Sequence, residues 1–414
     1  MANDTLFPIN LDIPNVKVID INMDGYYEIF VESTKEGCNC HKCGKHITKQ
    51  HGLDREIRLK HLSILEKDTY IIIRLPRYQC ESCLKQPTTT QQVSWFIRRS
   101  PFTIAYEMYV LSLLIGSNAQ EVSQKEGIGY ASVLGIINRH VKTNVDWDKI
   151  KSLSQLGLDE ISLKKGHKDF VTIVSTKVNG EIKILAILKD RKKETVKKFL
   201  SSIPKNLVKT IRSVCSDLYD GFINAAKDVF GKRVRIVADR FHVAKLYRGC
   251  LDSLRKKELK RLKQDLSKNE YDQLKGAMWV LRKNTNDLSE ENKALLDKLF
   301  EYSPDLKMAY DFQNDLTSIF NMDLPRKTGK RKINSWITKV RKSNVECYDK
   351  FLSTLESYMT EIVNYFVHRD SSGFVEGLNN KIKVIKRRCY GILNVDHLFQ
   401  RIFLDLSGRK VFSL

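Results

Sequence analysis

The sequence predicts an α+β protein of several domains, and three observations lead to that prediction. Two Cys-x-x-Cys pairs lie within residues 1–98, among short β-rich runs. Residues 99–148 have helical patterning. From about residue 149 strand-like runs alternate with helical ones, and a long, charged helical stretch at about 245–345 interrupts them. We therefore expect a metal-binding β segment, a helical segment, and a mixed α/β domain that contains a helical insertion.

The composition favours a polyanionic partner. The chain has 414 residues, enough for two or three domains, and 42% of them are hydrophobic, which suffices for a buried core. Lys and Arg number 71 against 49 Asp and Glu, so the net charge is +22. A protein tolerates such an excess most readily when it binds a polyanion, and solubility alone is the simpler alternative. Because neither a signal peptide nor a membrane-spanning run is visible, we expect a cytoplasmic protein with no membrane partner.

The paired cysteines predict one structural Zn²⁺ ion. Cys40-x-x-Cys43 and Cys80-x-x-Cys83 present four thiolates, which complete the coordination of a tetrahedral ion. Cys38 is a spare cysteine that could compete as a ligand, and a disulfide framework is not expected in a reducing compartment. The neighbouring histidines are interpreted as surface or packing residues: His41, His46, His51 and His61.

The helical segment predicts a helix-turn-helix, with an ordinary helical hairpin as the alternative. Two short helices flank a Gly-Ile-Gly turn at 127–129, and the second of them, at roughly 130–142, would be the recognition helix. The seam between the helices would consist of Val122, Val133, Ile136 and Ile137. The residues expected near DNA are Tyr130, Ser132 and Arg139.

The third segment has an informative order of elements. The expected sequence is strands 156–163, 169–178 and 181–190, helix 192–204, strand 210–217, helix 219–231 and strand 234–239. Asn179-Gly180 separates the second and third strands and is a strong hairpin signal, because a type I′ turn needs positive φ at both central residues. The later strands are connected through helices and are expected to be parallel. A mixed sheet covered by helices matches a ribonuclease-H-like fold, and the hairpin argues against an all-parallel doubly wound domain.

Carboxylates lie at strand positions of this predicted sheet. Asp159 is within the first strand, and Asp217 and Asp239 end two later apolar strands. Each alone is more often a turn or helix cap. Together they suggest a Mg²⁺-type site, because a carboxylate in an apolar strand is costly to bury unless it is paired or metal-bound. A two-metal site needs a further carboxylate, and the best candidate is Glu376, near the start of a helix that ends in Lys and Arg.

Four stretches carry a resemblance to a known family: GLDE (157–160), VCSDLYDGF (214–222), VADRFHVAK (237–245) and SSGFVEGLNNKIKVIKRRCYG (371–391). Together they resemble the ISL3-family transposases of bacterial insertion sequences, and the similarity extends from the cysteine cluster to the C-terminus. The resemblance implies that Asp159, Asp217 and Glu376 are a metal-binding DDE triad and that Asp239 and His242 form an accessory D-x-x-H motif. The resemblance also implies a zinc-binding segment in the N-terminal part of the chain. Ser372 departs from the pattern, since family members often have Asn there.

The implied function is a DNA transposase that binds terminal inverted repeats, cleaves strands at the ends of the element and joins them to target DNA. Two Mg²⁺ or Mn²⁺ ions would occupy the catalytic site. The implied partners are double-stranded DNA and at least one further copy of the chain in the complex that pairs two ends, at the bacterial nucleoid. No P-loop or dinucleotide fingerprint is present, so we expect no nucleotide cofactor. The DNA-binding residues expected on the last motif are Asn379, Lys381, Lys383, Lys386, Arg387 and Arg388.

These expectations divide the chain into four domains. They are a zinc-binding domain at 1–98, a helix-turn-helix at 99–148, a catalytic core at 149–244 and 346–414, and a helical insertion at 245–345. Within the insertion, PRKTGKRK (325–332) is expected to be a flexible loop that contacts flanking DNA. Two other functions remain open, namely a DNA-binding regulator descended from a transposase and a two-metal nuclease without strand transfer.

Overall fold

The computed structural model describes residues 11–164, 168–178, 180–283, 285–343, 345–371, 373–392 and 394–412, without the side chains of 164, 168 and 373–376. It divides into two compact units. The first consists of Met1–Lys142 and Gln400–Leu414, and the second of Thr143–Phe399. Each unit has its own hydrophobic clusters, and each is described here by itself. No helix of the described residues is long and apolar enough to cross a membrane.

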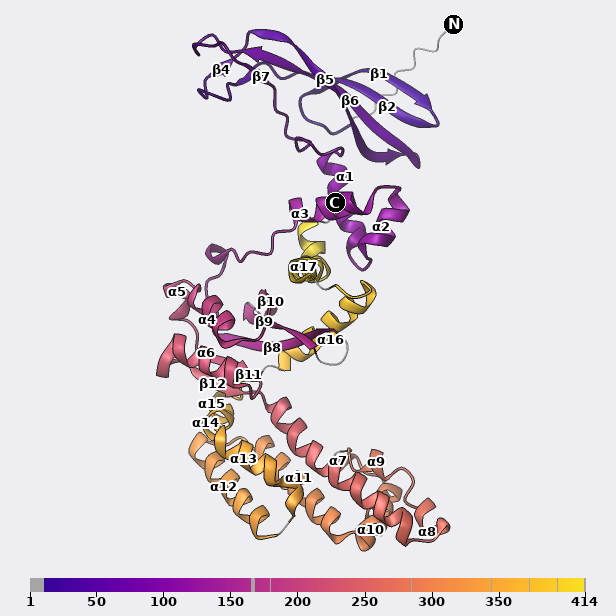
Figure 1. Cartoon of the computed structure of the whole chain (residues 1–414), viewed down its shortest axis with the longest axis vertical. Helices are drawn as coiled ribbons and strands as arrows, with labels where there is room; N and C mark the ends of the chain where they lie inside the picture. Colours follow the sequence, from indigo (N-terminus) through magenta and orange to yellow (C-terminus); the bar gives the residue numbers. More distant parts are fainter. Residues whose placement is uncertain are drawn as a thin grey trace. The chain divides into compact units, whose positions relative to one another are not determined.

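The first unit begins with a five-stranded sheet (Figure 1). Its strands are β1 (Val16–Asp24), β2 (Tyr26–Ser33), β5 (Gln50–Ile64), β6 (Lys67–Gln79) and β7 (Thr88–Thr90), in the order β1-β2-β6-β5 with β7 beside β6. The apolar run YIIIRL (70–75), one of the β-rich runs near the cysteines, lies in β6, where Ile71 and Ile73 pack against Leu59 of β5. A separate pair, β3 (Cys38–Asn39) and β4 (His46–Ile47), flanks the turn that contains Cys40 and Cys43.

Three helices follow in the first unit: α1 (Ile104–Leu114), α2 (Ala119–Glu126) and α3 (Tyr130–His140). Asn118 caps α2 by accepting a hydrogen bond from Glu121 N, and Gly127 ends it with a φ of 61°, a conformation that glycine adopts without strain. The predicted seam is confirmed, because these side chains are buried in one cluster: Val122, Val133, Ile136 and Ile137.

The C-terminal helix α17 (Val395–Phe412) contributes its residues from Gln400 onward to the first unit. Leu404 and Phe412 lie in the cluster of α1–α3, and the buried guanidinium of Arg401 donates to the carbonyls of Leu114 and Ser117 at 2.8 and 2.7 Å. The sequence predicts that this stretch belongs to the catalytic core at 346–414. The structure places it with α1–α3, because these apolar side chains and the paired guanidinium are buried there.

The second unit is built on a five-stranded mixed sheet in the order β10-β9-β8-β11-β12. The strands are β8 (Gln155–Lys164), β9 (Lys168–Val178), β10 (Glu181–Leu188), β11 (Ser213–Ser216) and β12 (Arg235–Ala238). β8, β9 and β10 pair antiparallel, whereas β8, β11 and β12 are parallel, so the predicted topology is confirmed and an all-parallel sheet is excluded. Gly180 has a φ of 84°, as the hairpin requires, and Asn179 lies outside the described residues.

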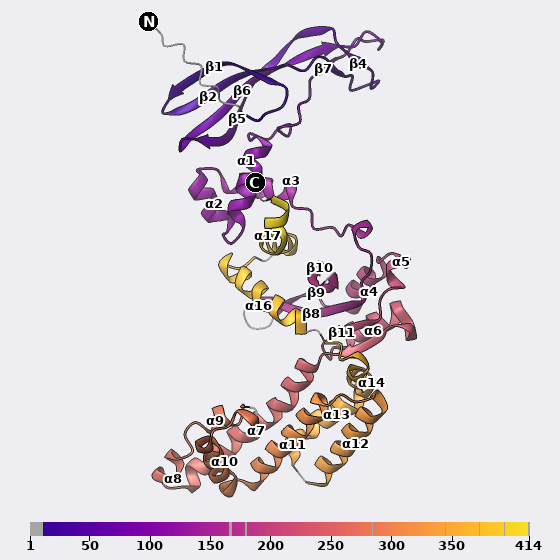
Figure 2. The same ribbon diagram turned by 180° about the vertical axis from the view of Figure 1, so that it is seen from behind.

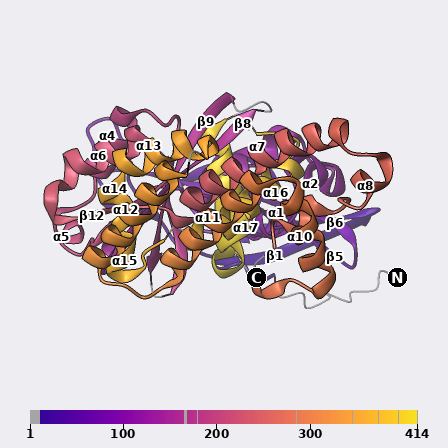
Figure 3. The same ribbon diagram turned by 90° about the horizontal axis from the view of Figure 1, so that it is seen from below.

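Helices cover this sheet where the chain crosses between parallel strands. α4 (Lys193–Ser201), α5 (Lys205–Val208) and α6 (Asp220–Phe230) follow the strands in the predicted order, and α4 lies beside α6 (Figure 3). Their apolar faces pack on the sheet, as for Val196 of α4 and Phe222 of α6 against Val214 of β11. Short 3₁₀ turns add η1 (Trp147–Lys149) and η2 (Gly231–Arg233).

The predicted helical insertion is present. It comprises α7 (Arg240–Asp265), α8 (Lys268–Asp272), α9 (Ala277–Val280), η3 (Thr285–Asp287), α10 (Glu290–Tyr302), α11 (Pro304–Asn321) and α12 (Arg326–Lys342). The chain returns to the sheet through η4 (Glu346–Tyr348), α13 (Asp349–Ser357), α14 (Met359–Val363) and α15 (Tyr365–His368). α11 lies beside both α7 and α12 (Figures 1 and 2), and their shared core includes Tyr247, Phe312 and Trp336.

PRKTGKRK is not a flexible loop, which corrects the sequence analysis. Pro325 caps α12, and the basic residues occupy its first turns. Gly329 is buried so closely against the ring of Phe366 that an added Cβ would lie 2.5 Å from it. Ile333 and Trp336 continue the same buried face. The charge of this run suggested a loop, but its apolar positions recur at helical spacing and fix it to the helical core.

Candidate metal centres

Three side chains that are distant in the sequence meet at one edge of the second unit's sheet. Asp159 lies in β8, Asp217 directly follows β11, and His242 lies in the first turn of α7. Their carboxylate oxygens and imidazole nitrogen all lie within 4.8 Å of one another. The register explains the meeting of the two aspartates. Leu158 is paired with Ser216 across the parallel strands, so the next residue on each strand is an aspartate at the same level.

Asp239 explains how His242 reaches this cluster. Asp239 follows β12, is buried, and accepts a hydrogen bond from Phe241 N at 2.8 Å, which makes it the N-cap of α7. His242, three residues later, is turned toward Asp217, with Nε2 at 3.0 Å from Oδ1. The D-x-x-H spacing therefore combines a helix cap with a histidine that contacts an aspartate of the cluster.

The sequence predicts that Asn379 contacts DNA, but in the structure its side chain contacts Asp159. It lies in α16 (Gly373–Arg388), which packs on β8, and its Nδ2 donates to Asp159 Oδ2. Both side chains are buried. The other carboxylate oxygen, Oδ1, accepts from Glu160 N at 2.7 Å. Asn379 therefore fixes the orientation of Asp159. Its helical spacing from the buried Leu378 and Ile382 was the available signal that it faces inward.

The electrostatics of the cluster favour a cation. Burial raises the pKa of Asp159 to about 6, and the nearby charge of Asp217 adds to that rise. Burial by itself lowers the pKa of His242, but the contact with Asp217 and the charges of Asp159 and Asp239 outweigh it and raise that pKa above its ordinary value. Two carboxylates this close repel each other unless a positive charge lies nearby.

The donor set fits a hard divalent cation. Mg²⁺ holds oxygen ligands at about 2.0–2.1 Å, so two of its ligand atoms lie within roughly 4.2 Å of each other. The donor atoms of Asp159, Asp217 and His242 all lie within 4.8 Å of one another, a separation of the same order as that span. Carboxylates are the ligands that Mg²⁺ and Mn²⁺ prefer, whereas imidazole is better suited to softer metals. We therefore interpret His242 as a partner of Asp217 and the aspartates as the ligands.

The third predicted ligand, Glu376, is described only in its backbone. Position 376 lies in the first turn of α16, one helical turn before Asn379, and its side chain lies outside the described residues, as does Ser372. Residues three apart on a helix are neighbours on its surface. Because Asn379 contacts Asp159, the first turn of α16 lies beside the cluster.

The four cysteines of the predicted zinc site come together in the first unit. The sulfur atoms of Cys40, Cys43, Cys80 and Cys83 all lie within 4.8 Å of one another, and Cys43 Sγ is 3.6 Å from Cys80 Sγ. A tetrahedral zinc with Zn–S bonds of about 2.3 Å needs sulfurs about 3.8 Å apart, so the cluster fits the ion. Hydrogen bonds from the backbone N–H groups of Cys43 and Lys42 lower the pKa of Cys40 to about 6, which favours the thiolate form that binds zinc.

The spare cysteine and the nearby histidines lie outside this cluster. Cys38 is buried with its thiol directed at the carbonyl of Thr89 (3.7 Å), and burial raises its pKa. His61 is buried and hydrogen-bonded to Thr103 Oγ1. The four cysteines therefore form the cluster whose spacing fits zinc, and Cys38 packs beside it.

Among the predicted DNA-contact residues of the first unit, Tyr130 and Ser132 lie in the first turn of α3, and Tyr130 is 48% exposed. Arg139 is different. Its guanidinium and the imidazole of His140 both pair with the fully buried carboxylate of Glu107 in α1. Arg139 therefore joins α3 to α1, and its guanidinium is directed at Glu107 rather than at DNA as the sequence predicts.

Fewer basic side chains of α16 are exposed than the sequence predicts. Lys381, Lys383 and Arg387 are exposed, and Arg388 is half-buried. Lys386 donates to the carbonyl of Ser162 in β8 at 2.7 Å, and burial lowers its pKa. Lys386 therefore anchors the helix to the sheet, because the inward face of α16 includes its position as well as Ile382 and Ile385.

Comparison with known proteins identifies the family. A family model described as transposase, of the DDE type of ISL3, matches residues 156–402, and one described as the zinc-finger of transposase IS204/IS1001/IS1096/IS1165 matches residues 36–83. The transposase for insertion sequence element IS1001 of Bordetella parapertussis is 26% identical over 384 residues, covering 92% of this chain and 91% of that protein. The transposase for IS1557 of Mycobacterium tuberculosis is 23% identical, covering 90% and 86%.

These matches define the class of protein as a DDE transposase with an N-terminal zinc ribbon. The first family model spans more than half of the chain and includes Asp159, Asp217, Glu376 and the helical insertion between the last two. The chain belongs to the ISL3 family of these transposases, as its motifs predicted.

Proposed function

We propose that this transposase binds the terminal inverted repeats of an insertion sequence, cleaves strands at those ends and joins them to target DNA. The observation that carries the proposal is the meeting of Asp159 and Asp217 on adjacent parallel strands, with Asn379 and His242 bonded to them. A buried carboxylate (Asp159) beside a second, half-buried one (Asp217), each held by a further side chain, is a costly arrangement that metal binding would explain.

We assign Asp159, Asp217 and Glu376 as the residues that hold two Mg²⁺ or Mn²⁺ ions. Bound divalent ions supply an activated oxygen nucleophile and stabilise the leaving oxygen in phosphodiester cleavage. Asn379 keeps Asp159 in one orientation. His242, held by the Asp239 cap, balances the charge of Asp217 in the metal-free site. The exposed Lys381, Lys383 and Arg387 on α16 neutralise phosphates near the scissile bond.

The finer fold assignments also belong to this proposal. The mixed sheet with an antiparallel hairpin followed by parallel strands supports a ribonuclease-H-like core. The buried seam of α2 and α3 and the turn at Gly127 support a helix-turn-helix, with Tyr130 and Ser132 at the end of α3 that reads DNA. The zinc ion is structural, since four cysteines leave it no open position. Pairing of two ends implies at least a dimer on DNA.

The test is cleavage and joining of DNA that carries the inverted repeats flanking the gene. Asp159→Ala and Glu376→Ala are expected to abolish cleavage while leaving binding to the end sequence largely intact. Glu194→Ala, an exposed carboxylate of α4, is the matched control and should cleave normally. Normal cleavage by either triad variant would remove the metal-site assignment.

A second arm separates the two alternative functions. End DNA that is already cut, with a free 3′-OH, is mixed with a target plasmid. Joining by the unmodified chain is expected of a transposase. Cleavage without joining would identify a nuclease, and binding without either reaction would identify a DNA-binding regulator.

A further inference from the structure

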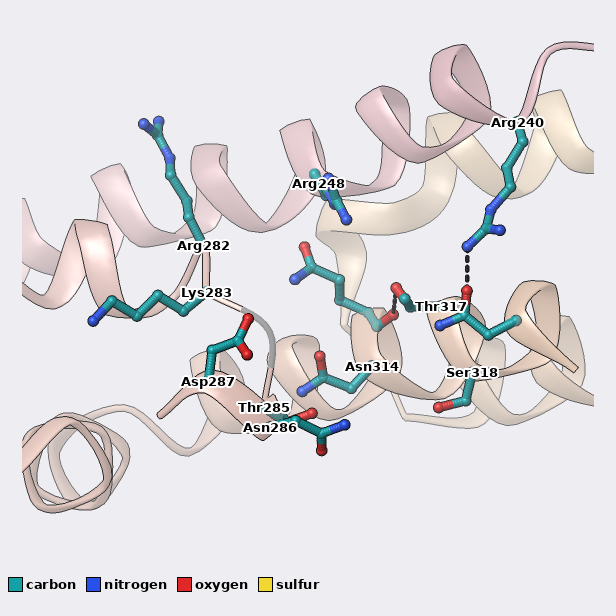
Figure 4. A pocket seen from close by; sticks show the side chains of 12 residues that line it. Arg240, Arg248, Arg282, Lys283, Thr285, Asn286, Asp287, Asn314, Thr317 and Ser318 are labelled. Carbon is teal, nitrogen blue, oxygen red and sulfur yellow. Dashed lines mark hydrogen bonds between the residues drawn. The ribbon is translucent and has the colours of Figure 1, made fainter. Parts of the chain in front are cut away.

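A basic groove runs along α7, away from the aspartate cluster and into the helical insertion. A cavity of about 530 Å³ lies between α7, η3 and α11, and its lining includes Arg240, Arg248, Lys283, Asn314, Thr317 and Asn321 (Figure 4). A second cavity of about 280 Å³ adjoins it, because Arg240 and Arg248 line both. Asp239 and Phe241, which lie beside His242, line the second cavity. We call these two cavities together the α7 groove.

The α7 groove has an excess of positive charge. Four cationic side chains line the larger cavity, against one carboxylate, Asp287. Arg282 is paired with Asp252 at 3.2 Å. Arg248 and Lys283 are exposed, and neither has an ion-pair partner among the residues that the structure describes. The positive charges of Arg248 and Lys283, together with that of Arg240, are therefore available to bind an anionic ligand.

Arg240 is held in place without losing its charge. Its guanidinium donates to Tyr365 Oη at 3.1 Å and to Asn321 Oδ1, which are both neutral oxygens. Figure 4 shows Arg240 and Arg248 along α7, facing α11, on which Asn314, Thr317 and Ser318 are labelled. A cation fixed by neutral partners is preorganised for an anion, since no internal salt bridge must break before binding.

The side chains that line the larger cavity are suited to bind the phosphate backbone of a nucleic acid rather than its bases. Its residues are charged, amide-bearing or hydroxyl-bearing, and none is aromatic. Such groups bind phosphate oxygens, whereas base recognition in single strands depends on aromatic stacking. The exposed Phe241 (44%) lies at the end of the groove nearest the aspartate cluster, where it can stack on a base. A cavity of this volume is of small-ligand size, which is narrow for a double helix and favours a single strand.

We propose that the α7 groove binds the phosphate backbone of one DNA strand that leaves the catalytic site. This inference rests on the proposed function, because it assumes that the aspartate cluster cleaves DNA. Arg240, Arg248 and Lys283 neutralise successive phosphates, and Phe241 separates this strand from its complement at the site. The helical insertion thereby holds the strand that cleavage frees.

The test is equilibrium binding of a fluorescent oligothymidylate of about 20 nucleotides to the full chain without divalent metal, across a salt series. The double variant Arg248→Ala/Lys283→Ala is expected to weaken binding on the order of tenfold and to reduce the salt slope by about 1.4, because each single-strand phosphate contact contributes about 0.7. The matched control is Lys260→Ala/Lys350→Ala, which removes two exposed lysines outside the groove and the same charge.

Two outcomes would overturn the proposal. One is an equal loss in both double variants, which would reflect general charge. The other is an equal loss for a blunt duplex, which would show that the groove does not select a single strand. Oligothymidylate binding is measured without divalent metal, whereas the cleavage assignment is tested by metal-dependent cleavage of end DNA by Asp159→Ala and Glu376→Ala. A failure of the groove proposal would therefore appear in the binding measurement, and a failure of the metal-site assignment would appear in the cleavage measurement.

Discussion

At the scale of single residues, the site depends on partners that hold its carboxylates. Asp159 is buried, and its two oxygens accept hydrogen bonds from Asn379 and from the backbone of Glu160. A carboxylate that carries a metal needs such partners, because they fix the direction of its lone pairs before the ion arrives. Asn379 is therefore a positioning residue of the aspartate cluster.

Asn379→Ala should raise the metal concentration needed for half-maximal cleavage by about 10–100-fold, as loss of a partner to a metal ligand typically does. Cleavage at saturating Mn²⁺ should recover in part, since the ligands themselves remain. The control is Asn380→Ala, which changes the exposed neighbour on the same helix. An unchanged metal requirement in Asn379→Ala would contradict the positioning role.

At the scale of elements, a single carboxylate joins the helices of the first unit. Glu107 in α1 is fully buried and accepts a hydrogen bond from Ser100 at 2.6 Å as well as the contacts of Arg139 and His140 from α3. Burial by itself raises the pKa of Glu107, but these three partners outweigh it and leave the pKa below its usual 4.5. The carboxylate is therefore stabilised in its charged form.

This arrangement gives a pH dependence with a defined sign. Because the folded-state pKa of Glu107 is the lower one, its stabilisation is fully present above the unfolded pKa of 4.5 and is lost as the pH falls through the folded value. Glu107→Gln should lower the free energy of unfolding by roughly 1–3 kcal/mol at pH 7, with a smaller difference below pH 4.5. Thermal unfolding of both proteins across that range measures it. Glu36→Gln, at an exposed site, should show no such difference.

Two basic residues of the helices α3 and α16 show that a positive charge alone does not predict a contact to DNA. The recognition-helix position of Arg139 and the positive charge of Lys386 predict contacts to DNA, but the structure directs both side chains toward internal acceptors. Their sequence positions already carried the signal, since each lies near the buried face of its helix. Long basic side chains can reach an internal oxygen while keeping an apolar stem packed.

At the scale of the whole molecule, the last residues of the chain complete a unit formed by the first. Leu404 is fully buried in the cluster of α1–α3, and Gly116 N donates to Asp405 at 2.9 Å. Residues almost 290 positions apart thus share one core. The core of the first unit therefore needs residues from α17 to be complete.

Leu404→Ala should destabilise that unit by about 2–5 kcal/mol, the usual cost of a cavity in a packed core. Limited proteolysis is expected to cut first within residues 104–142, as their helices open more often. Val411→Ala, on the same helix but 56% exposed, should leave the cleavage pattern unchanged. Faster proteolysis confined to the second unit in Leu404→Ala would contradict this assignment.

The sequence by itself determined the elements and most of the chemistry. Periodicity and turn residues fix local structure, so the strands from 156 to 239, their antiparallel and parallel pairing and the helical insertion were predictable. Paired Cys-x-x-Cys spacing predicted a thiolate cluster, and the family motifs pointed to Asp159 and Asp217. These features depend on residues that are close along the chain or on motifs that can be read directly.

Only the tertiary structure decided which distant side chains meet. The contact of Asn379 with Asp159, the acceptors that Arg139 and Lys386 reach, and the packing of α17 against α1 each join segments far apart along the chain. Helical spacing can show that a side chain faces inward, but it does not show which distant group that side chain meets. The α7 groove is of the same kind, because it exists only where α7, η3 and α11 lie together. Side-chain burial and pairing are settled by the free energy of the assembled core, which no single stretch of sequence contains.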